Sequence, residues 1–305
     1  YRKPKLGSRP DWIDDEKNNF FPLSDLIRQI KGAKSEKKQK SCVSKFIEEY
    51  IEILKTYRKE GGRTGEQVYK CFLDMKTIRD IFLEFLSALS ETELNFADVI
   101  SDAFEQMHNT LTTATGFDSN ATHACESDYE IYNIHIWELF ICVTAYLRHL
   151  QNYKSIYELL NRTYFLTPSC LDSVVRPVNY CSFYFYSELI ERQYKPTTED
   201  KDRFTLSGHT LCTEREKKPI YTGEALAEAD VFLYQVKNAY QFNEDRSMYW
   251  ESCWFPACYV YAKTWPIEWT KIKSRKYCEK MFELFGVNSI DTLKEKLKNC
   301  IAEPA

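Results

Sequence analysis

The sequence predicts a mainly α-helical protein, and three observations support this prediction. Glycine is scarce, with nine in 305 residues, whereas β-rich folds use many glycine-containing turns. Apolar residues recur at i, i+3 and i+4 along most of the chain, as in helices with one buried face. One segment, residues 129–152, is apolar on all but a narrow stripe. We therefore expect a bundle-like array of helices around this core helix, with one short β-hairpin near residues 203–213.

Interruptions in the helical pattern predict the domain organisation. Residues 1–20 contain two prolines and a glycine among many charges, which indicates an extended linker. Residues 21–112 predict an N-terminal helical subdomain. A polar, threonine-rich stretch follows it, and residues 124–301 then predict a C-terminal helical subdomain around the core helix at 129–152.

The individual helices follow from the same periodicity. In the N-terminal part we expect helices at residues 22–32, 37–60, 65–88 and 91–111. In the C-terminal part we expect the core helix, a shorter helix directly after it, and helices at 174–193, 223–240, 250–263, 268–285 and 289–300.

Polar residues at the expected helix starts predict N-terminal caps. Ser127 and Glu130 have the spacing of a capping box at the core helix, and Ser155 with Glu158 repeats it at the next helix. Asn288 or Ser289 is expected to cap the last helix.

Charge and cysteine content limit the classes of protein to consider. The net charge of -4 gives no general attraction to nucleic acid or to an anionic membrane. The eleven cysteines are an odd number without CxxC pairs, which favours reduced thiols in a cytosol. The apolar run at 134–150 contains charged residues and histidines, so we do not expect a membrane span. We expect a soluble, cytoplasmic protein.

Motifs for common cofactors and metals are absent from the sequence. It contains no GxGxxG, GxxxxGK[ST], HExxH or GxSxG pattern. His123, Cys125, Cys253 and Cys258 could offer soft ligands to zinc, but a structural zinc site normally uses close-spaced pairs. We therefore expect no metal site and no cofactor.

Arg203 and His209 are the only candidate catalytic pair. Their spacing, in Arg-Phe-Thr-Leu-Ser-Gly-His, resembles the motif of HEPN ribonucleases. That resemblance implies metal-independent cleavage of RNA at a dimer interface, with the motif at the start of a helix. Here Ser207-Gly208 interrupts the expected helix, and a solvated loop pair is the alternative reading. We favour a protein without catalytic activity in these residues.

Polar residues on the core helix have structural and functional interpretations. Glu130, Glu138 and Arg148 share its polar stripe, where they could form a partly buried ion network or meet another subunit. We favour the network. His135 lies on the apolar side, and we expect a core histidine with one hydrogen bond rather than a catalytic one.

Large aromatic rings are concentrated between residues 249 and 269. The candidate binding residues there are Trp250, Trp254, Tyr259, Trp265 and Trp269. Such rings can anchor a protein partner or stack nucleic-acid bases, and they can also form a core. Because the net charge is negative, we place a protein partner or self-association ahead of nucleic acid. If the rings are exposed, replacing Trp254 or Trp265 should weaken binding and leave stability unchanged.

Several segments resemble a bacterial defence family. The opening residues 1–12 are similar to the connecting piece after a TIR or SEFIR-like domain, and residues 136–147, 157–160, 228–234 and 254–262 resemble the helical C-terminal part of such proteins.

This resemblance implies an effector domain before Tyr1, which cleaves NAD or recruits like domains. The present residues would then be a non-catalytic sensor or oligomerisation module that controls it. A HEPN-like ribonuclease and a nucleic-acid-binding helical module remain the alternatives.

Overall fold

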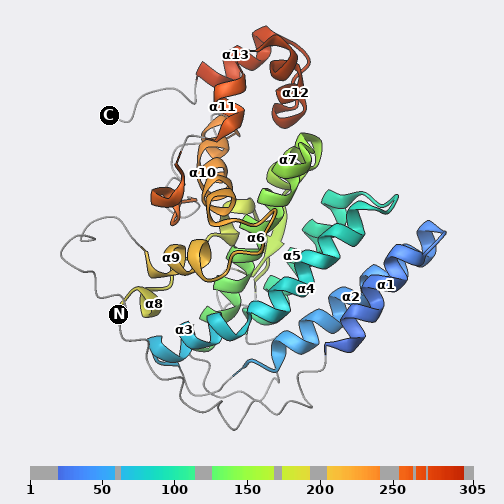
Figure 1. Cartoon of the computed structure of the whole chain (residues 1–305), viewed down its shortest axis with the longest axis vertical. Coiled ribbons are helices and arrows are strands. Elements are labelled where there is room, and N and C mark those ends of the chain that lie inside the picture. The colour runs from blue at the N-terminus through green and yellow to red at the C-terminus, as the bar shows by residue number, and fades with distance from the viewer. Residues whose placement is uncertain are drawn as a thin grey trace.

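The computed structural model describes residues 20–58, 63–113, 126–167, 174–192, 205–240, 254–263, 266–272 and 274–298. These residues form thirteen α-helices, three short 3₁₀-helices and one two-stranded antiparallel sheet. The mainly α-helical prediction is confirmed. The core helix runs through the middle of the molecule, between the blue N-terminal helices and the orange and red C-terminal helices (Figure 1).

The N-terminal helices largely match the predicted ranges. They are α1 (Phe21–Gly32), α2 (Glu36–Lys55), α3 (Gly65–Asp74), α4 (Lys76–Ser90) and α5 (Phe96–Leu111). The predicted helix at 65–88 is two helices, separated at the buried residue Met75. The fifth begins later than predicted because Asn95 caps it: its Oδ1 accepts hydrogen bonds from the amides of Ala97 and Asp98.

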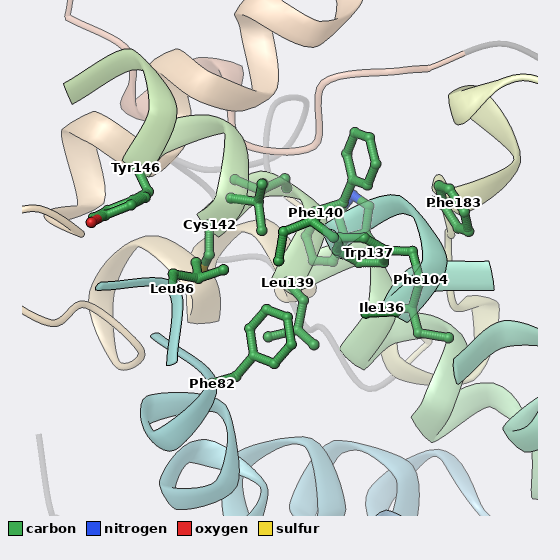
Figure 2. Packing of buried hydrophobic residues seen from close by; sticks show 14 of the residues in the cluster. Phe82, Leu86, Phe104, Ile136, Trp137, Leu139, Phe140, Cys142, Tyr146 and Phe183 are labelled. Atoms are coloured by element: carbon green, nitrogen blue, oxygen red, sulfur yellow. The ribbon is translucent and has the colours of Figure 1, made fainter. Parts of the chain in front are cut away.

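The predicted core helix is confirmed as α6 (Glu130–Leu150), and α7 (Tyr153–Leu160) follows it. Every residue of α6 from Ile134 to Leu147 is buried. Helices α3, α4, α5, α7 and α10 (Gly223–Tyr240) all contact it. Figure 2 shows Phe140 of α6 among the buried rings, 5.1 Å from Phe104 and 5.3 Å from Phe183 between ring centroids.

The capping box predicted at the start of α6 is wrong. Tyr129 is the N-cap residue and makes no side-chain cap. Ser127 Oγ instead accepts the backbone N–H of Arg63 at 3.0 Å, and the Glu130 carboxylate accepts a hydrogen bond from the Ser187 hydroxyl. Both side chains therefore bind segments that lie far away in the sequence.

The cap of α7 is also different from the prediction. Asn152 Oδ1 accepts the Ser155 amide at 3.1 Å, so Ser155 lies inside the helix and does not cap it. At the last helix, α13 (Ile290–Lys298), the prediction is confirmed, because Ser289 Oγ accepts the Thr292 amide at 3.2 Å.

The remaining elements are shorter than the core helix. They are the strands β1 (Tyr164–Leu166) and β2 (Arg176–Val178), the helices α8 (Glu188–Glu191), α9 (Leu206–Thr213), α11 (Ile267–Lys271) and α12 (Arg275–Phe285), and the 3₁₀-helices η2 (Glu126–Asp128), η3 (Tyr180–Phe183) and η6 (Tyr259–Tyr261).

The hairpin predicted near residues 203–213 is wrong for the part that the structure describes. Residues 206–213 form α9, and Thr205 Oγ1 caps it by accepting the Gly208 amide at 3.0 Å. Gly208 serves packing rather than a turn, because a Cβ atom there would clash with the backbone carbonyl of Ala257. The short sheet lies elsewhere, where β1 pairs with β2.

Two predicted helices are absent from the described residues. Within 174–193, the chain forms β2, η3 and α8, and Pro177 stands in β2. Within 254–263, only η6 is helical, and Pro256 disfavours helical backbone at the residue before it. Proline therefore interrupts both segments despite their helical apolar spacing.

The buried apolar residues form one continuous cluster that extends from Leu23 of α1 to Leu293 of α13. Both predicted subdomains contribute to it. The boundary between the two subdomains stays a prediction.

A buried ion network crosses the core at Glu138 of α6, but its partners differ from the predicted ones: Glu130 and Arg148 of the same stripe bind other residues. The Arg215 guanidinium holds this carboxylate with two hydrogen bonds of 2.6 Å, and Arg79 Nη1 of α4 lies 3.7 Å from it. All three side chains have no exposed surface. Burial alone would raise the pKa of Glu138, but the two guanidiniums outweigh it and lower the pKa.

His135 is a core histidine, as predicted. Its Nε2 is 2.8 Å from the Tyr50 hydroxyl, and its Nδ1 is 3.9 Å from a Glu138 carboxylate oxygen. Burial lowers the pKa of His135 to about 3, because the charged ring would lose its hydration. The ring is therefore neutral near pH 7.

The C-terminal end of α6 forms a second ion network through Arg148. Arg148 makes two hydrogen bonds with Glu268 of α11, of 2.9 and 2.7 Å, and one of 3.0 Å with Glu228 of α10. The network fixes the end of α6 to two later helices.

We predict that Glu138→Gln lowers the free energy of unfolding by about 3–5 kcal/mol, because it removes the carboxylate partner of the buried Arg215 and leaves the buried Arg79 with Asp80 alone. Urea titration followed by circular dichroism measures this. Glu188→Gln is the control, since Glu188 pairs with Arg192 at the surface and should cost less than about 1 kcal/mol. Equal losses in the two variants would contradict the structural role of Glu138.

Candidate protein-contact site

The structure describes three residues of the predicted contact surface. Trp254 and Tyr259 lie in the segment from Trp254 to Ala262, and Trp269 lies in α11. The segment lies beside α10 (Figure 1). Asp230 of α10 is fully buried and anchors the segment at two points. One carboxylate oxygen accepts the indole N–H of Trp254 at 2.7 Å, and the other accepts the Cys258 amide at 2.8 Å. Asp230 thus fixes the path of an irregular stretch of chain.

The indole of Trp254 is part of the core, which corrects the prediction that it is an exposed binding residue. It has no exposed surface. Its ring lies 5.7 Å from Phe140 and 5.7 Å from Tyr184 between centroids. The physical reason is that Asp230 satisfies the indole N–H, so the whole ring can leave water. Truncating Trp254 would therefore cost about 3–5 kcal/mol of stability.

Helix α9 and its cap residue also contact the same segment. Thr205 Oγ1 donates to the carbonyl oxygen of Ala257 at 3.2 Å, where the missing side chain of Gly208 allows close approach. The Tyr261 hydroxyl is hydrogen-bonded to Nδ1 of His209. Contacts with α9 and α10 therefore position the segment.

Two rings of this segment point to solvent. Phe255 is 53% exposed and Tyr259 is 48% exposed. Phe255 packs edge-on against the half-buried Tyr184 at 6.1 Å, and Tyr186 lies exposed two residues further along that chain. We call Tyr184, Tyr186, Phe255 and Tyr259 the aromatic patch. Because Trp254 points inward, the next residue in extended chain points outward.

The other predicted binding residues have different fates. Trp269 of α11 is half-buried, with its ring 6.1 Å from Phe285 and 6.5 Å from Phe232. Trp250 and Trp265 lie outside the described residues. Of the predicted set, only Tyr259 is therefore described and strongly exposed.

Sequence reasoning missed Tyr184 and Tyr186, because it placed them in a helix at 174–193. In the structure they lie in extended chain between η3 and α8. Ser187 could have indicated this, because serine often marks the start of a helix. It caps α8 by accepting the amide of Ile190 at 3.2 Å, so Tyr184 and Tyr186 precede that helix.

The pair considered for the ribonuclease alternative is described only in part. Arg203 lies outside the described residues. His209 is half-buried on α9, and one of its ring nitrogens is engaged with Tyr261. The structure therefore does not test whether Arg203 and His209 lie close together, as the ribonuclease alternative requires.

The four candidate zinc ligands are likewise only partly described. Cys258 is buried, whereas His123, Cys125 and Cys253 lie outside the described residues. Within the described ranges, no group of three or more His, Cys, Asp or Glu side chains could hold a metal ion.

Comparisons with models of protein families, with curated proteins and with solved structures give no match. Among the described helices, none combines the length and apolarity needed to cross a membrane.

The Asp230 carboxyl is electrostatically unusual. Burial raises its pKa to about 6, and the hydrogen bonds from Cys258 and Trp254 offset only part of that rise. The folded protein therefore binds a proton at Asp230 at a pH where the unfolded chain has already released it.

We predict that Asp230 makes stability fall as pH rises from about 4 to about 6. Across this window only the folded state holds the proton, so the free energy of unfolding of the wild type, relative to Asp230→Asn, should fall by about 3 kcal/mol. Urea titrations of both proteins at several pH values measure this difference. Asp25→Asn, at the surface of α1, is the control and should show no such trend. A difference that stays constant or grows with pH would contradict the prediction.

Proposed function

We propose that this chain is the non-catalytic sensor or assembly module of a bacterial TIR-type defence or signalling protein. It controls an effector domain that the resemblance places before Tyr1, and it acts through self-association at the aromatic patch. The observation that carries the self-association is the exposure of Phe255 and Tyr259 on a segment anchored to the core by Asp230.

The physical properties of the patch suit a protein contact. Aromatic rings bury a large area and lose little conformational entropy, so they often dominate the binding energy of an interface. Here the buried Trp254 and the Tyr184–Phe255 packing hold the segment before any partner arrives. A pre-organised surface loses less entropy on binding than a mobile one.

The charges near the patch favour a second copy of this chain as the partner. Glu188 and Arg192 form an exposed pair shortly after Tyr186, and Lys263 forms another with Glu224 shortly after Tyr259. A two-fold contact places the same surface on both sides, so charges of both signs at its edge allow opposite charges to face each other. The two pairs provide charges of both signs.

Self-association could control an effector domain by changing how many copies of it lie together. A trigger would have to bind the associated state better than the monomer, or the reverse, because only differential affinity shifts an equilibrium.

We predict that Phe255→Ala weakens self-association at least tenfold, which corresponds to about 1.4 kcal/mol. Sedimentation velocity over a range of protein concentrations measures the association constant. Phe165→Ala is the matched control, because Phe165 of β1 is also 53% exposed but lies outside the patch. Neither variant should change the melting temperature by more than a few degrees.

Two results would overturn the proposal. The wild type could remain a monomer at every concentration, or both variants could associate as strongly as the wild type. Cleavage of labelled RNA that disappears in His209→Ala would instead establish the ribonuclease alternative.

A further inference from the structure

The turn between α1 and α2 concentrates positive charge at one edge of the molecule, at the right of Figure 1. Residues 28–40 contain six Lys or Arg residues and one Glu, although the whole chain has a net charge of -4. All six cationic side chains are exposed. A local excess of one sign attracts ligands of the opposite sign even when the protein as a whole is anionic.

The backbone of this turn is fixed from the inside. Gln39 of α2 is buried, and its side-chain amide donates to the carbonyl oxygen of Ala33 at 3.1 Å. The amide of Ala33 in turn donates to the carbonyl oxygen of Ile30 at 3.3 Å. The cations therefore project from an ordered helical hairpin, and a ligand that binds there does not have to order the backbone first.

Half of these cations are already neutralised by acidic neighbours, and the other half are not. Three form exposed ion pairs, which are Arg28 with Asp25, Lys31 with Glu91, and Lys40 with Glu36. Lys34, Lys37 and Lys38 form no ion pair with any residue that the structure describes. Their charges lie close together along the chain, so a ligand with closely spaced negative charges could contact all three.

We propose that Lys34, Lys37 and Lys38 bind the phosphates of double-stranded nucleic acid without regard to its sequence. A duplex carries one negative charge for about every 1.7 Å of its axis, so it offers several phosphates to three neighbouring lysines. Contacts between lysine and phosphate fix the position of a protein on the duplex but do not distinguish one base from another.

The side chains around the lysines favour a duplex over a single strand or a membrane. Among the described residues, none of the exposed large apolar side chains lies between residues 28 and 40. Proteins that bind single strands stack the bases on aromatic rings, and helices that lie on membranes insert apolar side chains among the lipids. A surface that offers lysine without such side chains suits the regular phosphate backbone of a duplex.

A duplex would also be the trigger that self-association requires, and this step rests on the proposed function. A long duplex can contact the lysines of two associated copies at once, whereas a monomer offers one set of lysines. The second contact is then intramolecular and raises the apparent affinity. The duplex therefore binds the associated state better than the monomer, and it shifts the equilibrium toward association.

The first test measures one set of lysines alone, in the Phe255→Ala background that weakens self-association. Fluorescence anisotropy follows the binding of a labelled DNA duplex of about 10 base pairs, which is about 34 Å long. Three phosphate contacts predict that raising the salt from about 50 to about 200 mM weakens binding about 40-fold.

The Lys37→Gln/Lys38→Gln double variant leaves one of the three contacts. It should bind the duplex at least about tenfold more weakly at low salt, and its salt effect should fall to about 3.5-fold. Lys154→Gln/Lys294→Gln is the matched control, because it removes the same charge from exposed lysines of α7 and α13. It should bind like its parent. Circular dichroism checks that both double variants keep the melting temperature.

The second test measures the effect of duplex length on association of the wild type. A folded chain of 305 residues is about 50 Å across. A duplex of about 40 base pairs, about 136 Å long, can therefore span two copies. In sedimentation velocity, this duplex should raise the association constant of the wild type, and the duplex of about 10 base pairs should not. Lys37→Gln/Lys38→Gln should abolish the effect.

The outcomes separate the binding surface from its role in association. Equal binding by the two double variants would overturn the proposal, as would tighter binding to single-stranded DNA or to phosphatidylserine vesicles than to the duplex. Duplex binding that leaves association unchanged refutes the role as a trigger. A wild type that never associates refutes the proposed function, while the anisotropy measurement still decides whether the lysines bind a duplex.

Discussion

The Glu138 carboxylate and its two arginines are the interaction on which the arrangement of helices depends. A charge buried this deeply is tolerated only with close partners of opposite sign. Arg215 reaches it from the connection between α9 and α10 and also donates to the carbonyl of Phe72 in α3. Arg79 of α4 donates to the carbonyl of Arg215. The network thereby joins α3, α4 and α6 to the connection between α9 and α10.

A second buried carboxylate, Asp230, is held by neutral hydrogen-bond donors instead of by a charge of opposite sign. It accepts hydrogen bonds from Trp254 and Cys258, so a stretch with little regular structure is fixed to α10 at two residues. The same anchoring exposes Phe255 and brings Cys258 against α9. The position of Phe255 and the position of Cys258 thus share one structural cause.

Much of the helical framework was predictable, because the signal for a long helix is local. The core helix expected at 129–152 is observed at 130–150, since a helix satisfies its backbone groups within the segment and this apolar run is too long for a typical strand. The short elements were not predictable. The segment at 174–193 has helical apolar spacing, but Pro177 and pairing with β1 favour a strand there. Local preferences amount to less than about 1 kcal/mol per residue, and tertiary contacts override them.

The sequence by itself determined the fold class, the core helix, the core histidine at 135 and the region where aromatic rings gather. Only the tertiary structure decided which rings face solvent. Trp254 and Phe255 are neighbours of similar hydrophobicity, yet one is buried and the other is half exposed. The difference comes from Asp230, which lies on another helix and satisfies the indole N–H. A pattern along the chain cannot reveal that pairing, because the free energy of burying a polar group depends on the partner that folding brings to it.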